Sequence, residues 1–152
     1  MRKSCLVGMI IVTVMGTAAT AGEASFSPDA AATWSARSLL MANVTQFEPG
    51  ELKGKFKVAC SDLTGEQLKH EYGKEPRWAL SAQLNICSGY NGWAGKFIGS
   101  KQPCKELEKG IKDLANATAA TAPPEVVTAA QALSTTARNL VDAAKQAKGC
   151  KL

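Results

Sequence analysis

Residues 121–147 read TAPPEVVTAAQALSTTARNLVDAAKQA, and they carry the clearest helical pattern of the chain. The Pro123-Pro124 pair ends one helix and opens another, because proline is well tolerated only in a helix's first turn. After it, small and aliphatic residues recur every four or three positions: Val126, Ala130, Leu133, Ala137, Leu140, Ala144 and Ala147. That spacing corresponds to one face of a helix, so the stretch predicts a long helix with a narrow apolar seam.

A second seam of the same kind precedes the two prolines. It consists of Leu107, Ile111, Leu114, Thr118 and Thr121. Two helices joined by so short a turn form an antiparallel hairpin. Alanine-rich seams bury little apolar area, so this hairpin needs the rest of the chain, or a crosslink, to be stable.

The upstream residues also read as helices. Ser27, Pro28 and Asp29 supply a cap, a first-turn proline and a first-turn carboxylate, and the residues at 48–50 end this first helix. Its helical spacing is carried by Ala32, Ala36, Leu40, Val44 and Phe47. Residues 50–61 predict a loop or one short extended piece. A capping-box pattern at Thr64 opens a short helix that fades at Gly73.

Pro76 opens the next predicted helix, which ends near Gly99 or Ser100. Ile86, Tyr90, Trp93 and Phe97 share one face of it, and Gly89, Gly92 and Gly99 fall largely elsewhere. Glycine costs about 1 kcal/mol relative to alanine in a helix, so this many glycines indicate a closely approaching neighbour. The alternative is a helix that breaks near Gly89, with the aromatic residues on a loop. The predicted fold is an all-α bundle of about four main helices and one short helix.

The N-terminal segment has the features of a secretory signal. Arg2 and Lys3 precede an uncharged apolar run, and Ala19 and Ala21 fit the small-residue cleavage pattern, so we expect cleavage after Ala21. Residues 1–21 are then a signal peptide, and residues 22–152 form a single domain. The alternative is a retained anchor, but the run is short for the roughly 20 residues that span a membrane.

Export changes the charge and the thiol count of the chain. Loss of Arg2 and Lys3 lowers the formal net charge from +5 to +3, too little to predict nucleic-acid binding. Lys53, Lys55 and Lys57 are a small basic cluster that reads as a solvated loop. No later stretch predicts membrane insertion, and the expected location is the periplasm.

Four cysteines remain after cleavage: Cys60, Cys87, Cys104 and Cys150. An even number in an exported chain predicts two disulfides, for which there are three pairings. Cys104 and Cys150 lie at ends of the hairpin helices that should be neighbours, which favours Cys104–Cys150 and leaves Cys60–Cys87. A metal or redox site is the weaker alternative, since C-x-x-C is absent.

Groups that could support catalysis are few. The single histidine, His70, lies in a short polar segment and reads as a surface residue. Two carboxylate pairs, Glu66 with Glu71 and Glu106 with Glu108, are badly spaced to share a helix face. No haem, EF-hand or phosphate-loop motif is present. The sequence thus favours a protein that is not an enzyme and holds no metal or cofactor.

The aromatic residues admit two interpretations. Trp34, Trp78, Tyr90, Trp93 and Phe97 are core residues in the favoured reading, and interface anchors or the lining of a ligand pocket in the other.

The cysteine pattern resembles a known family. Cys87-Ser88-Gly89-Tyr90, followed by Gly92, Cys104 and a helical pair closing at Cys150, is similar to the Tai-type immunity proteins. The resemblance covers residues 60–150. It implies a small helical periplasmic protein that binds and blocks a peptidoglycan amidase delivered by type VI secretion. It assigns no inhibitory residue.

Together these features predict a binding protein with a protein partner. The leading hypothesis is an immunity-type inhibitor of an exported effector that attacks the cell wall. The alternatives are a periplasmic chaperone or envelope-assembly accessory protein, and a small-ligand carrier whose pocket would be lined by Trp34, Trp78 and Trp93.

Overall fold

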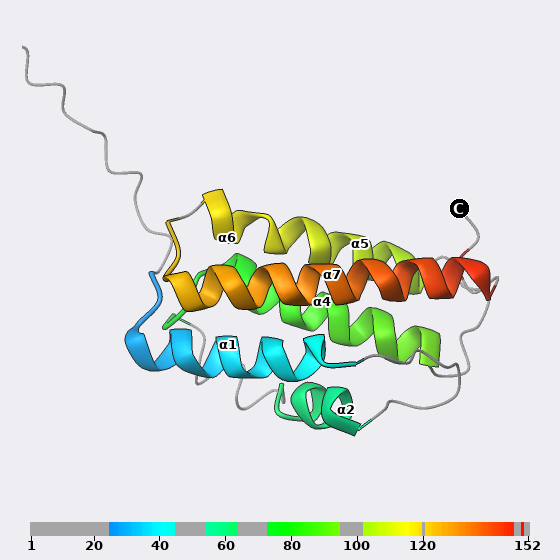
Figure 1. Cartoon of the computed structure of the whole chain (residues 1–152), viewed down its shortest axis with the longest axis horizontal. Helices are drawn as coiled ribbons and strands as arrows, with labels where there is room; N and C mark the ends of the chain where they lie inside the picture. Colours follow the sequence, from blue (N-terminus) through cyan, green and yellow to red (C-terminus); the bar gives the residue numbers. More distant parts are fainter. Residues whose placement is uncertain are drawn as a thin grey trace, which may run out of the picture.

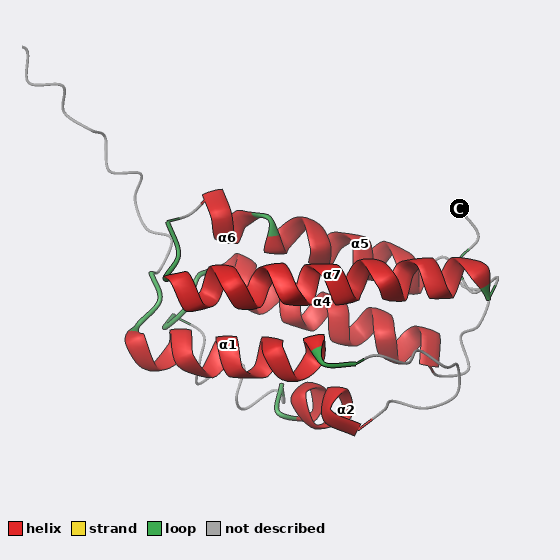
Figure 2. Ribbon diagram, in the orientation of Figure 1, coloured by secondary structure: helices red, strands yellow, loops and turns green. Residues whose placement is uncertain are grey.

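The computed structural model describes residues 25–44, 54–63, 73–94, 102–119, 121–147 and Cys150. In these ranges every regular element is a helix: α1 (Pro28–Ala42), α2 (Gly54–Ser61), α4 (Arg77–Ala94), α5 (Gln102–Leu114), α6 (Asn116–Ala119) and α7 (Pro124–Gln146). Figure 2 shows this helical architecture, and the predicted all-α fold is confirmed. The predicted signal peptide, the short helix at Thr64, His70, the pair Glu66 and Glu71, and the predicted helix end near Gly99 all lie outside the described residues.

The long helices lie side by side in a bundle (Figure 1). α5 and α6 run back along α4, and α7 then runs back along α5 and α6, so the predicted C-terminal antiparallel hairpin is present. α1 lies against α7 and points the same way, and α2 packs beside α1. The most extensive helix contact is that between α4 and α5.

The helix ends follow the local chemistry of the sequence. The Ser27 hydroxyl accepts a hydrogen bond from the backbone N–H of Ala30 at 3.3 Å, which caps α1. Pro124 opens α7, with Pro123 as its N-cap residue. Thr121, in the turn between α6 and α7, has a φ of 43°, in the left-handed region.

Two local predictions were wrong. The first helix was expected to end at residues 48–50, but α1 ends at Ala42 with Asn43 as its C-cap residue, so Val44 lies outside it. Residues 50–61 were expected to be a loop or an extended piece, yet Gly54–Ser61 form α2, and Lys55 and Lys57, expected in a solvated loop, lie on this helix. Ala59 is fully buried and Cys60 is bonded to Cys87 on α4, so tertiary contacts hold this short segment as a helix. Packing and a crosslink override the weak local pattern of lysine and glycine.

The apolar seam of α7 forms the centre of the core. All of its residues from Val126 to Ala144 are at most 2% exposed, whereas Ala147 is exposed. A second core region lies near the N-terminal ends of α1 and α4, where the rings of Phe26, Trp34 and Trp78 meet edge to face with centroids about 6 Å apart.

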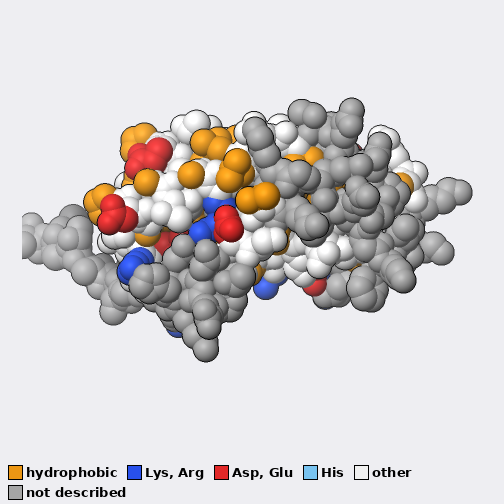
Figure 3. Space-filling model, turned by 90° about the horizontal axis from the view of Figure 1, so that it is seen from below, with side chains coloured by type: hydrophobic (Ala, Val, Ile, Leu, Met, Phe, Trp, Pro, Cys, Tyr) orange, Lys and Arg blue, Asp and Glu red, His pale blue; other side chains and the backbone are white. Residues whose placement is uncertain are grey.

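α1 buries a different face from the one that its alanine spacing marks. Ala32 and Ala36 are exposed, whereas Trp34 and Met41 are completely buried. One buried tryptophan contributes more apolar area than two alanines, so it sets the rotation of the helix. The face left outside carries Ala32, Ala36 and Leu39, and Figure 3 shows hydrophobic side chains gathered on this side of the molecule.

Two disulfides crosslink the bundle. Cys60 is bonded to Cys87, with Cα atoms 5.6 Å apart, and Cys104 to Cys150, with Cα atoms 5.8 Å apart. These are the pairs that the order of the helices favoured. The first ties α2 to α4, and the second ties the end of the chain after α7 to the start of α5.

Candidate functional site

The described aromatic candidates belong to the core. Trp34, Trp78, Tyr90 and Trp93 are at most 6% exposed, and Phe97 lies outside the described residues. Trp34 and Trp78 pack on each other, and the Trp34 ring N–H donates to the backbone oxygen of Ala79 at 2.8 Å. The core interpretation is confirmed for these four. Neither a surface anchor nor an open tryptophan-lined pocket is seen among them.

A buried polar cluster joins α1 to α4. The Gln83 side-chain amide donates to the Ser38 hydroxyl at 2.8 Å and to the Trp34 backbone oxygen at 3.0 Å. Its oxygen accepts from the Arg37 guanidinium at 2.9 Å. Arg37 is only 5% exposed, and the bond to Gln83 offsets part of the loss of water around its charge. The cluster holds two helices in register, and the sequence pattern gave no sign of it.

Two groups of polar side chains join α4 to α5. The Asp113 carboxylate accepts from the Ser81 hydroxyl at 2.7 Å and from the Asn85 amide at 3.1 Å. Near the other end, the Ser88 hydroxyl donates to Glu106 at 2.6 Å. Both groups contain a hydroxyl and a carboxylate, but each carboxylate is used to connect two helices. Glu106 thus contacts α4, whereas Glu108 Oε1 lies 3.8 Å from Lys145 Nζ on α7, so these two carboxylates contact different helices.

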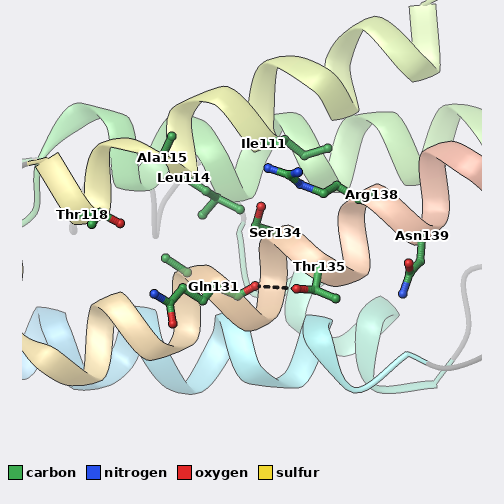
Figure 4. A pocket seen from close by; sticks show the side chains of 10 residues that line it. Ile111, Leu114, Ala115, Thr118, Gln131, Ser134, Thr135, Arg138 and Asn139 are labelled. Carbon is green, nitrogen blue, oxygen red and sulfur yellow. Dashed lines mark hydrogen bonds between the residues drawn. The ribbon is translucent and has the colours of Figure 1, made fainter.

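A groove of about 380 Å³ separates α7 from α5 and α6 (Figure 4). Its volume falls within the roughly 300–1,000 Å³ of known ligand sites. The α5–α6 side is formed by Ile111, Leu114, Ala115 and Thr118, and the α7 side by Ala130, Gln131, Ser134, Thr135, Arg138 and Asn139. Hereafter we call these ten residues the groove.

The groove lies where residues of the predicted hairpin seam are not covered by α7. Leu107 and Leu114 are buried, but Ile111 is half-buried and Thr118 is exposed. Several of the lining side chains are small, among them Ala130 and Ser134 on α7, and α5 ends at Leu114, so α6 begins after a one-residue turn. Small residues therefore leave space that a leucine seam would have filled.

One charged side chain lies in the groove. Arg138 is exposed and extends from α7 toward Ile111 on α5 (Figure 4). Among the described residues it makes no hydrogen bond or ion pair, and no acidic residue lines the groove. Most of the polar rim is equally open to solvent: Gln131, Thr135 and Asn139 are exposed, and Thr135 bonds only to the Gln131 backbone oxygen, at 3.1 Å. Within the described structure, the groove thus combines an apolar floor, neutral polar groups and one free cation.

Sequence reasoning did not single out the groove. The signal was present in the mixture of small and polar residues on the α7 face next to the seam, where Gln131, Ser134 and Arg138 are spaced three and four residues apart. Within the described residues no three His, Cys, Asp or Glu side chains gather in a way that could hold a metal ion. None of the described helices is both long and apolar enough to span a membrane.

Comparison with protein-family models, curated proteins and solved structures found no match for this chain.

Proposed function

We propose that this protein is a non-enzymatic binding protein of the bacterial periplasm, and that its partner is an exported effector which attacks the cell wall. In this role it acts as an immunity-type inhibitor. The observation that carries the proposal is the groove, because its rim groups are exposed and its guanidinium has no partner within the described structure. Polar groups left free around an apolar floor are what a protein partner can use.

Two other features support this proposal. Disulfides such as Cys60–Cys87 and Cys104–Cys150 persist in oxidising compartments and are rare in the reducing cytosol. The described clusters that contain hydroxyls and carboxylates connect helices to one another, which leaves binding as the simplest use of the free surface. The similarity of the cysteine pattern to Tai-type immunity proteins directs the choice of partner toward cell-wall amidases.

The proposal is tested by co-expression in the periplasm of a susceptible bacterium. Candidate amidase effectors encoded near this gene are exported together with the full chain, and survival is counted. We expect protection of at least a hundredfold for the matching effector. The control is the same chain without residues 1–21, which should remain in the cytoplasm and give no protection. Failure of the full chain to protect against any effector from its own genome would exclude the immunity role.

A role in envelope assembly is the second candidate, because the outer face of α1 exposes Ala32, Ala36 and Leu39. Apolar surface of this kind can hold unfolded or unassembled proteins. Suppression of the aggregation of a reduced model protein, measured by light scattering, would support this candidate. Substitution of Leu39 by glutamine should then weaken the suppression, and unchanged activity of that variant would count against the α1 face.

A further inference from the structure

We propose that the groove recognises an extended segment of the partner protein in which an aliphatic side chain and an acidic one are neighbours. The aliphatic group would lie on Ile111 and Leu114, and the carboxylate would bind Arg138. This inference rests on the proposed binding role and specifies the chemistry that the partner must present.

The charge of the groove selects for an acidic group. Arg138 is the single ionisable residue among the ten that line it. A guanidinium presents N–H donors in a planar fork that matches both oxygens of a carboxylate. Without a carboxylate in the lining, the guanidinium has no partner there until a ligand supplies one.

The shape of the groove favours a chain segment over a compact ligand. It runs between two helices, and its rim residues Thr118, Gln131, Thr135 and Asn139 are exposed along it. Amide and hydroxyl groups of this kind can both donate to peptide carbonyls and accept from peptide N–H groups. An apolar floor with polar groups at the edges is typical of sites that bind one side chain and the backbone beside it.

Peptide probes test this chemistry directly. We would label the purified protein with ¹⁵N and titrate it with acetyl-Ala-Leu-Glu-Ala-amide, its glutamine counterpart, and acetyl-Ala-Leu-Ala-Ala with a free C-terminus. The glutamic acid peptide should bind about tenfold more tightly than the glutamine peptide, with shifts concentrated on residues of the groove. Equal binding of these two peptides, shifts elsewhere on the protein, or preference for the free C-terminus would overturn the proposal.

Two variants separate the role of Arg138 from general charge effects. Arg138→Gln should abolish the preference for the glutamic acid peptide. Lys109→Gln removes the same charge from an exposed position of α5 outside the groove, and should keep the preference. Loss of the preference in both variants would mean that only the net charge matters, which would overturn the assigned site.

The cell assay distinguishes failure of this inference from failure of the proposed function. If the wild-type chain protects and Arg138→Glu lowers protection at least tenfold at equal protein level, both stand. If Arg138→Glu protects as well as the wild-type chain, the groove assignment fails and the immunity role remains. If the wild-type chain never protects, the immunity role fails, and the peptide titrations still decide what the groove binds.

Discussion

α5 faces two neighbours, and it contacts them in opposite ways. Against α4 it packs closely, because Gly89 and Gly110 allow the backbones to approach: a Cβ at Gly89 would lie 2.8 Å from the Pro103 backbone oxygen, and one at Gly110 would lie 3.1 Å from that of Ala82. Between α5 and α7 lies the groove, and the Cys104–Cys150 disulfide connects the two helices at one end. One pair is held by packing, and the other by a crosslink together with the apolar seam. The difference shows how a small bundle can combine a rigid part with an open one.

The largest expected effect comes from removing the Cys104–Cys150 disulfide, which ties the chain after α7 to the start of α5. Replacement of both Cys104 and Cys150 by serine should lower the free energy of unfolding by about 4 kcal/mol, because the bond closes a loop across a sequence separation of 46 residues. Urea denaturation measures this loss, and amide exchange should rise in α7 before it rises in α4. The matched double variant at Cys60 and Cys87, with a separation of 27, should lose slightly less. A loss below about 1 kcal/mol would mean that the seam alone holds α7 in place.

The close approach of α4 and α5 provides the second test. Gly89→Ala would place a methyl group 2.6 Å from Leu107 Cγ as well as against the Pro103 backbone, and should cost about 2 kcal/mol even though alanine is the better helix former. Gly92→Ala is the control on the same helix, since its nearest atom is a Pro103 side-chain carbon at 3.1 Å. That variant should be neutral or slightly stabilising by thermal melting. Equal melting temperatures for the two variants would contradict a close contact specific to Gly89.

These glycines illustrate what the sequence could predict. Several glycines within a helical pattern indicated a closely approaching neighbour, and the structure confirms this for Gly89 and, less tightly, for Gly92, whereas Gly110 on α5 was not part of that prediction. The hairpin and the cysteine pairs were also predictable, because they depend on periodicity and on the order of the helices. All of these features can be inferred from the spacing and order of residues in a single sequence.

The rest depends on tertiary contacts that have no local pattern. Arg37 looks like an ordinary surface residue in the sequence, yet it is buried because Gln83, many residues away, accepts its hydrogen bond. The rotation of α1 follows from the burial of Trp34 and not from its alanine spacing. The groove arises because Ile111 and Thr118 are not covered, a result of small differences in side-chain size across two helices.

The polar contacts between α4 and α5 should contribute less to the free energy of unfolding than the packing of these two helices. Asp113→Ala removes the acceptor of the half-buried Ser81 hydroxyl and one of the two acceptors of the Asn85 amide, and should cost about 1.5 kcal/mol. Ser88→Ala removes a hydrogen bond to Glu106 at an exposed position and should cost no more than about 0.5 kcal/mol. Chemical denaturation of both variants measures the difference. A larger loss for Ser88→Ala would show that the outer end of α4 and α5 depends on its surface contact.

The smallest effect on stability is expected in the groove itself. Arg138→Gln should change the free energy of unfolding by less than about 0.5 kcal/mol, because the side chain is exposed and has no partner among the described residues. Ser134→Leu, which adds apolar volume between the helices, should be neutral or slightly stabilising while it blocks the groove to the peptide probes. Thermal melting and peptide titration on the same samples measure both properties. If Arg138→Gln destabilised the protein by more than about 1 kcal/mol, the guanidinium would stabilise the folded state. The contact of α5 with α7 would then depend on this side chain, as the contact of α5 with α4 depends on its packing.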